Sequence, residues 1–425
     1  MYKIAILNTT HFENKGSMGR IEGLISCLEQ TIPGCEITIL HRYFKQDEQN
    51  LSQQLVAKYN SLEIIEHPWY RESNSSIMTV MGSLVRYIFL KFRKASLKSQ
   101  LQQYDTIVDL NLIEPDKCTA RVDLEDLVGN LLTLLNISSA NITDKPMIVC
   151  SATIGPFASS FLRNVAKRVL NEVDLITLRE HYSKDYLYHI GINKPETVLT
   201  ADLAFLLEPP DMSEIPAILD QIEVSLADRP LVGIGPTAMM DPSLPREEYI
   251  KFMADISEYL ISNKGATIIY IAHTYQDRDI AEAVYKEINN KEKARILPFE
   301  LSAEETKGVI GSCDLFICSR FHALVASTSL GIPTIGIVAY SRNKFHGIIG
   351  NMMGQEDYLI DIDSNFKYNA YLTKLKDKIN EILKNQSSVS DELKERYKYV
   401  RKQTLLNGEL IKEMIDKGHS GDYEN

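Results

Sequence analysis

The sequence predicts an α/β protein with two doubly wound, Rossmann-like domains that face each other across a cleft. Short apolar runs alternate with helical patterns along most of the 425 residues, which is typical of parallel βαβ units. These runs form two series, separated by a polar stretch that contains EPPDMSEIP. A chain of this length can bury two hydrophobic cores. We therefore expect two domains of the same class.

The domain boundaries follow from the positions of the two series. We expect an N-terminal domain over residues 1–210, a helix-bearing linker over 211–230 and a C-terminal domain over 231–385. Residues 386–425 read as a helical segment, with a helix rich in both charge signs at Ser390–Lys417. We expect this helix to pack on the outside or to face solvent, and we assign it no chemistry.

The predicted strands are the short apolar runs of each series. In the first domain they are Lys3–Leu7, Glu36–Leu40, Thr106–Asp109, Met147–Ser151, Leu175–Thr177 and Thr197–Leu199. In the second domain they are Leu231–Ile234, Ala266–Ile271, Arg295–Leu297, Asp314–Cys318 and Pro333–Ile337. Helical patterns such as Arg246–Asn263 and Arg278–Asn289 lie between the strands of the second series.

Five loops are expected to converge on the cleft. In open parallel sheets, ligands bind beyond the carboxyl ends of the strands. The loops that follow such strand ends here are Asn8–Gly19, Ser151–Phe157, Gly235–Met240, His273–Asp277 and Ser319–His322.

Composition excludes several function classes. The net charge of −11 and a pI near 5.4 argue against a nucleic-acid partner, because neutralising phosphates requires a basic face. The six cysteines form no C-x-x-C pair, so we expect reduced core residues. No run of about eighteen apolar residues and no secretory pattern occurs, which predicts a cytosolic protein that does not span a membrane.

The most informative stretch is SRFHALVASTSLGIP, which starts at Ser319. A buried strand leads into a helix over Arg320–Ser329, and Gly331 ends that helix. Ser319, Arg320 and His322 are thereby presented at a helix N-terminus, where backbone N–H groups and an arginine fork favour a phosphate or carboxylate. The alternative is that Arg320 pairs with a core carboxylate while His322 caps or packs.

This stretch resembles the C-terminal signature of the polysaccharide pyruvyl transferase family. The signature S-R-x-H-A, followed by G-x-P and a loop containing Lys and ending in Gly, matches the stretch above and AYSRNKFHG, which carries Lys344. NKGSMG, SATIGPF, TLREHYSKDYLYHIGI and ADLAFLL resemble other family segments in the same order, over roughly residues 4 to 350. Many relatives carry an acid in the first of these loops where this chain has Ser17.

The resemblance implies a fold and a reaction. Members of the family resemble the two-domain glycosyltransferase architecture called GT-B. They use phosphoenolpyruvate to place a pyruvate ketal across two hydroxyls of a sugar. The resemblance therefore implies phosphoenolpyruvate as donor substrate and a saccharide or lipid-linked saccharide as acceptor. No H-E-x-x-H, carboxylate cluster or Walker loop occurs, so we expect neither a metal nor a cofactor.

The donor side is assigned to the second domain. Arg320 and Lys344 suit the phosphate and carboxylate of the donor, and the amides of Ser319–His322 would complete the anion site. We assign His322 as the acid/base, because the unperturbed pKa of histidine lies near neutrality. His273 is the next candidate, with capping or packing as its alternative. Asp277 could bind the same ligand or cap a helix that begins near Arg278.

The acceptor side is assigned to the first domain. Asn14 and Gly16 would let backbone approach a sugar or phosphate, and Gly155 shapes a turn beside them. Arg179, with Glu180, could line the acceptor site, although an intramolecular ion pair explains them equally well. Asp202 could hold a sugar hydroxyl or stabilise the first loop.

A basic helical segment suggests contact with a membrane surface. Ile77–Leu101 has apolar residues at helical spacing and carries no acid. Its five cations are Arg86, Lys91, Arg93, Lys94 and Lys98. Such a helix could rest on an anionic membrane, which would suit a lipid-linked acceptor. The alternative is an ordinary domain helix with solvated lysines.

Two other functions fit the same fold. A GT-B glycosyltransferase would use a nucleotide sugar, but no convincing acid for the ribose hydroxyls follows the Gly235 loop. A non-catalytic saccharide-binding protein would be consistent with Ser17 in the first loop.

Overall fold

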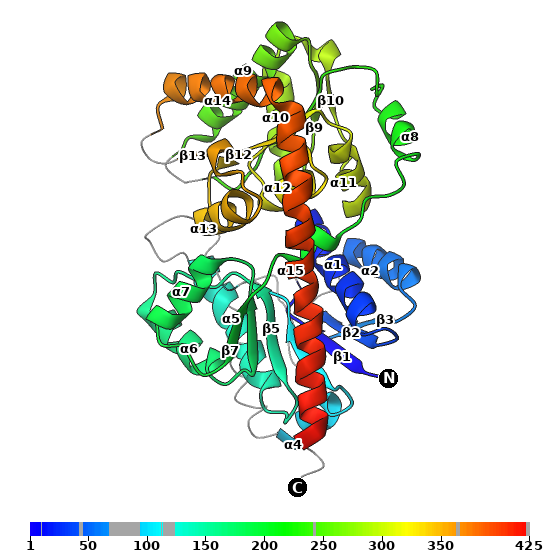
Figure 1. The fold of residues 1–425 in the computed structure, drawn as a ribbon, viewed down its shortest axis with the longest axis vertical. Helices are drawn as coiled ribbons and strands as arrows, with labels where there is room; N and C mark the ends of the chain where they lie inside the picture. The colour runs from blue at the N-terminus through cyan, green and yellow to red at the C-terminus, as the bar shows by residue number, and fades with distance from the viewer. Residues whose placement is uncertain are drawn as a thin grey trace.

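The fold of the chain is described by a computed structural model. It describes residues 1–9, 11–41, 46–67, 94–111, 113, 124–240, 244–362 and 366–421. Two parallel sheets, each with helices on both faces, lie one beyond the other along the long axis of the molecule (Figure 1). The predicted fold class of two doubly wound domains is confirmed.

The N-terminal domain is built on a seven-stranded parallel sheet with the order β3-β2-β1-β4-β5-β6-β7. Its strands are β1 (Lys3–Leu7), β2 (Glu36–His41), β3 (Leu62–Glu66), β4 (Thr106–Asp109), β5 (Met147–Ala152), β6 (Leu175–Leu178) and β7 (Glu196–Leu199). Its helices are α1 (Lys15–Thr31), α2 (Gln46–Lys58), α4 (Lys94–Leu101), α5 (Leu124–Ala140), α6 (Ser160–Leu170), α7 (His181–His189) and the 3₁₀ turn η1 (Leu203–Leu206). Strand β3 was not predicted.

The C-terminal domain has a six-stranded parallel sheet with the order β10-β9-β8-β11-β12-β13. Its strands are β8 (Leu231–Gly235), β9 (Thr267–Tyr270), β10 (Ala294–Ile296), β11 (Leu315–Cys318), β12 (Thr334–Val338) and β13 (Leu359–Asp361). Its helices are α9 (Arg246–Lys264), α10 (Tyr275–Glu287), α11 (Ala303–Gly311), α12 (Phe321–Ser329), α13 (Arg342–Lys344) and α14 (Tyr368–Lys384), with short turns η2 (Lys291–Lys293), η3 (Phe345–Met352) and η4 (Glu356–Tyr358). Strand β13 was not predicted.

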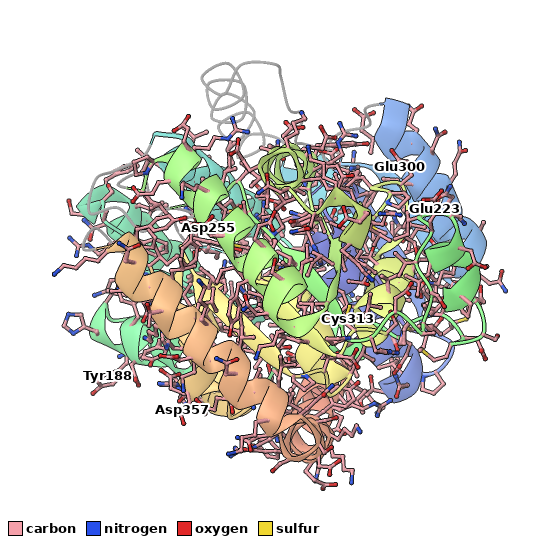
Figure 2. The ribbon with its side chains drawn as sticks, turned by 90° about the horizontal axis from the view of Figure 1, so that it is seen from above. Tyr188, Glu223, Asp255, Glu300, Cys313 and Asp357 are labelled. Carbon is pink, nitrogen blue, oxygen red and sulfur yellow. The ribbon has the colours of Figure 1, made fainter. Side chains whose placement is uncertain are left out.

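Burial explains why these segments form strands and helices. The side chains of β4, β5, β6, β8 and β11 are buried along their whole length, as expected for parallel strands covered on both faces. Helix α9 ends at Gly265 in the left-handed conformation, and α11 begins with a capping box between Ser302 and Glu305. Asp255 lies on α9 at the outside of the domain (Figure 2). Its carboxylate accepts a 2.6 Å hydrogen bond from Tyr368 Oη of α14.

The connections between the domains lie on one side of the molecule. The segment from η1 to β8 contains the short helix α8 (Ile215–Asp220), where a helix-bearing linker was predicted. The long helix α15 (Gln386–Gly421) starts beside the C-terminal domain and runs down past the N-terminal sheet (Figure 1). Its buried residues Leu393, Val400, Ile411 and Ile415 show that it is a packed helix.

The strand order of the two sheets indicates where a ligand site lies. Strand order reverses between β1 and β4 in the first sheet and between β8 and β11 in the second. The loops that follow β1 and β11 therefore lie at the two switch points, where ligands bind in folds of this kind. These loops lead into α1 and α12, whose first turns contact one another across the domain junction.

No helix in the described part of the chain is long and apolar enough to cross a membrane. The five described cysteines are free and buried, as predicted; Cys118 lies outside the described residues. Of Ile77–Leu101, only the residues of α4 are described.

Candidate functional site

The first turn of α1 lies directly against His322 of α12. Asn14 caps α1 by accepting hydrogen bonds from the amides of Gly16 (3.0 Å) and Ser17 (3.3 Å). A Cβ atom at Gly16 would lie 2.7 Å from His322 Cγ and closer still to Nδ1. Glycine is needed here because His322 occupies the space that a side chain would fill. Asn14 and Gly16 thus lie in the junction, where they were predicted.

His322 faces a buried ion pair from the N-terminal domain. Arg179, at the end of β6, donates from Nε to Thr153 Oγ1 (2.7 Å) and from Nη1 to Asp202 Oδ2. Its guanidinium carbon is 5.0 Å from the ring centroid of Phe321. His322 Nε2 lies 3.8 Å from Asp202 Oδ2, which is too long for a hydrogen bond. Arg179, Asp202 and His322 therefore meet in one place, although they come from different domains.

Burial and neighbouring charges shift the pKa values of His322 and Asp202. Burial lowers the pKa of His322 to about 4, helped by Arg179 and Arg20 and opposed by Asp202. His322 is therefore neutral at pH 7 and can accept a proton. Burial alone would raise the pKa of Asp202, but Arg179, His322 and Arg20 together hold it below its usual value. Asp202 is an anion beside a neutral imidazole.

Arg320 is paired with a carboxylate of its own domain. Its Nε and Nη2 donate to the two oxygens of Asp277, at 2.6 and 2.8 Å, and Nη2 also donates to Thr274 Oγ1 at 3.1 Å. The ion pair given above as the alternative is therefore present. The predicted capping role of Asp277 is wrong, because α10 begins at Tyr275 and Thr274 is its N-cap. Asp277 instead accepts from the amide of Ala238 at 2.8 Å.

Three of the four amides that were expected to bind an anion donate hydrogen bonds within the C-terminal domain. The N–H of Ser319 donates to Gly235 O (2.9 Å), that of Arg320 to Cys318 Sγ (3.1 Å) and that of Phe321 to Tyr340 Oη (3.3 Å). The hydroxyl of Ser319 is fully buried, 2.8 Å from Tyr249 Oη. Groups of the C-terminal domain itself therefore satisfy these three amides.

His273 and Lys344 complete the C-terminal side. Burial, together with Lys15, Arg320 and His322, lowers the pKa of His273 well below its usual value. Lys344 is buried, with Nζ 5.1 Å from the ring centroid of Tyr340 and 5.8 Å from that of Phe321. His273 thus lies close enough to His322 for the two side chains to interact, and Lys344 lies beside Phe321, the residue before His322.

Two buried ring nitrogens at the junction lack a hydrogen-bond partner within the described residues. They are His322 Nε2 and His273 Nδ1. Buried polar atoms are nearly always hydrogen-bonded, so these two nitrogens indicate a place for a polar ligand at the junction.

The remaining predicted residues have local roles. Gly155 adopts a positive φ of 71°, and a Cβ there would lie 2.5 Å from Tyr186 Cδ1. It therefore shapes a turn that packs on α7. Glu180 caps α7 by accepting from Ser183 N at 3.0 Å, so Arg179 pairs with Asp202 instead. At the far end of α7, Tyr188 projects into solvent (Figure 2).

Lys15 and Arg20 of α1 were not predicted. Lys15 Nζ donates to the carbonyls of Phe299 (2.8 Å) and Leu301, which joins α1 to the C-terminal domain, and burial lowers its pKa to about 8. Arg20 Nη2 donates to Ser151 O at 3.2 Å, and burial, with Arg179 nearby, lowers its pKa to about 10. Arg20 could have been identified from the sequence as a cation among the apolar residues of a helix. Within the described residues, no group of three or more His, Cys, Asp or Glu side chains gathers as a metal site.

Comparison with known proteins establishes the family. The sequence model described as "Polysaccharide pyruvyl transferase" matches residues 126–342, which is half of the chain. The chain belongs to the polysaccharide pyruvyl transferase family. A similar curated protein is the amylovoran biosynthesis protein AmsJ of Erwinia amylovora, 20% identical over 441 residues, covering 97% of this chain and 99% of that protein. The predicted family and a role as a transferase in polysaccharide biosynthesis are confirmed.

Two solved structures share the fold of this chain. Anabaena Alr3699/HepE in complex with UDP and glucose has a TM-score of 0.59 at 14% identity, covering 98% of this chain and 100% of that one. Sucrose-phosphate synthase from Thermosynechococcus elongatus has a TM-score of 0.59 at 12% identity, with the same coverage. At such identities the similarity shows the fold alone, and it confirms the GT-B-like architecture of this pyruvyl transferase family member.

Proposed function

We propose that this protein transfers the enolpyruvyl group of phosphoenolpyruvate to a sugar of a surface polysaccharide, or of its lipid-linked precursor, to form a pyruvate ketal. The observation that carries the proposal is the pair of unpartnered nitrogens, His322 Nε2 and His273 Nδ1, in a junction that also holds Lys15, Lys344 and Arg320. A small dianion such as phosphoenolpyruvate offers acceptor oxygens to Lys344 and His273, while an unprotonated His322 Nε2 can accept a hydrogen bond from a sugar hydroxyl.

The reaction balances without a cofactor. A proton is added to the methylene carbon of phosphoenolpyruvate, one sugar hydroxyl forms a C–O bond to C2, and phosphate leaves as its C–O bond breaks. The second hydroxyl then bonds to C2 and closes the ketal. The two hydroxyl protons end on the new methyl group and on phosphate. The protein must therefore move protons and stabilise a developing cation at C2.

Each residue has a role in this scheme. Neutral His322 accepts a hydroxyl proton, and the anion Asp202 stabilises the imidazolium that results. Arg179 holds Asp202 in place. Lys344 and His273 bind the donor, while Arg320 fixes the loops through Asp277 and Thr274. Asn14 and Gly16 bring the first domain to His322.

The proposal also covers the cellular location of the protein and the kind of saccharide acceptor. We infer a cytosolic enzyme, with a lipid-linked acceptor presented at the membrane. The segment Ile77–Leu101 is retained as a candidate for peripheral contact; one of its cations, Lys98, forms an ion pair with Asp144. No cofactor or metal is included in the scheme.

Donor specificity tests the proposal. The protein would be incubated with phosphoenolpyruvate and model or lipid-linked galactosides, and phosphate release and the mass gain of the ketal would be followed. We expect both products in equal amounts with the wild type. Sugar transfer from a nucleotide sugar, without reaction of phosphoenolpyruvate, would reject the proposal in favour of a glycosyltransferase. That alternative is motivated by the UDP and glucose in the HepE complex.

A further inference from the structure

The long helix α15 places one buried asparagine beneath the site. Asn407 is fully buried, and both ends of its side-chain amide are used. Its Oδ1 accepts hydrogen bonds from Thr177 Oγ1 (2.6 Å) and Thr200 Oγ1 (2.9 Å). Its Nδ2 donates to Ala201 O (3.2 Å) and to Thr404 O (2.9 Å). A buried amide with this many partners fixes the groups around it.

The partners of Asn407 are the segments that carry the site. Thr177 lies two residues before Arg179 and accepts a 2.7 Å hydrogen bond from the amide of Ser151. Thr200 and Ala201 immediately precede Asp202. Asn407 therefore joins the carboxyl ends of β5 and β6 to the segment that follows β7.

The Ala201 carbonyl is held from two sides. Ser151 Oγ donates to it at 3.1 Å, and Asn407 Nδ2 donates at 3.2 Å. Since Ala201 and Asp202 are adjacent, a shift of this carbonyl moves the Asp202 backbone. The Asp202 carboxylate in turn lies 3.8 Å from His322 Nε2. The position of Asp202, an anion close to His322, thus depends on a side chain of α15.

The packing of α15 keeps Asn407 at this depth. A Cβ atom at the next residue, Gly408, would lie 2.9 Å from Cys27 Sγ and nearer to Thr31 Oγ1, so α15 and α1 approach closely here. Toward the C-terminal domain, Tyr397 Oη donates to Phe205 O (2.9 Å) and Gln386 Nε2 to Asp314 O (3.0 Å). The helix is therefore anchored in both domains around Asn407.

We propose that Asn407 is a positioning residue for proton transfer: by holding Ala201 and Thr200 it sets the distance between Asp202 and His322. The part of this inference that concerns proton transfer and turnover rests on the proposed function. The charged groups that shift the pKa of His322 include Asp202, Arg179 and Arg20. His322 in turn helps to lower the pKa of His273. Of these, Asp202 raises the pKa of His322, and it is the group that Asn407 positions.

The test compares Asn407→Ala and the isosteric Asn407→Asp with Ile411→Ala. Ile411 is fully buried one turn further along the same helix, so its truncation destabilises α15 without touching the amide network. For both Asn407 variants we expect kcat to fall on the order of tenfold to a hundredfold, the effect of about 1 Å of misplacement. The KM for phosphoenolpyruvate should stay within about threefold, since the donor-binding groups lie elsewhere.

A substrate-free measurement separates this inference from the proposed function. The ring signals of His322 would be followed by NMR, with assignment from His322→Gln. In the Asn407 variants they should shift, and the acid limb of kcat/KM should move to lower pH because Asp202 recedes. Ile411→Ala should match the wild type in both. Unchanged His322 signals in Asn407→Asp would overturn the inference, whereas absent turnover of phosphoenolpyruvate in the wild type would overturn only the proposed function.

Discussion

Gly16→Ala should disable the site with little effect on stability. The added Cβ would lie 2.7 Å from His322 Cγ and 2.9 Å from His322 Cβ, whereas ordinary contacts between such atoms are 3.4 Å or more. Because the clash includes the atom nearest the backbone, rotation of the ring cannot relieve it. His322, or the whole first turn of α1, must move by roughly 1 Å, a displacement that can lower turnover about a hundredfold.

The stability terms for this substitution oppose one another. Alanine is favoured over glycine in a helix by about 0.5–1 kcal/mol, while overpacking costs about 1–3 kcal/mol. The net change should therefore be a loss of about 0–2.5 kcal/mol, which thermal denaturation would measure. Phosphate release from phosphoenolpyruvate would measure kcat.

Gly19→Ala is the matched control. Gly19 lies one turn further along α1, and its Cβ would be 3.5 Å from Leu207 Cδ2, an ordinary contact. It should leave kcat within about twofold of wild type. If Gly16→Ala and Gly19→Ala had equal, near-wild-type kcat values, the close packing of α1 against His322 would have no part in catalysis.

Three further outcomes are expected. His322→Ala should keep the fold and lower kcat by about 10²–10⁴-fold, whereas unchanged specific activity would remove it from the mechanism. Arg320→Ala should lower the free energy of unfolding by about 3–5 kcal/mol in urea denaturation, since Asp277 is left buried and unpaired; a loss below about 1 kcal/mol would contradict this pairing. Stability should also fall as pH drops from about 6.5 to 4, because there the unfolded chain binds a proton that folded His322 does not. With the folded pKa at about 4, this contribution is about 3 kcal/mol, and His322→Gln should remove it from the pH dependence of unfolding.

Most of the fold could be predicted because parallel strands that are buried on both faces appear in the sequence as short apolar runs. β4 (TIVD) and β8 (LVGIG) are such runs. β3 (LEIIE) was missed because its exposed glutamates break the run, and β13 (LID) because acidic residues flank its short apolar pair. These missed strands lie at the edges of their sheets, where burial is least complete.

The sequence predicted which loops form the site, but it did not predict which side chains in those loops contact one another. The topology that brings loop ends together could be inferred, so Asp202 and His322 were both named from the sequence. Their proximity, and the pairing of Arg179 with Asp202 and not with neighbouring Glu180, depend on side-chain directions that sequence spacing does not fix. Asn407 gave no signal, since one polar residue on a charged helix has no distinguishing pattern.

The most direct test of the central claim is calorimetric titration of the wild-type protein with phosphoenolpyruvate and, separately, with UDP. The unpartnered nitrogens of His322 and His273 predict binding of phosphoenolpyruvate at one site per chain. UDP should show no binding. Saturable binding of UDP, with none of phosphoenolpyruvate, would contradict the assignment of this junction as a pyruvyl donor site.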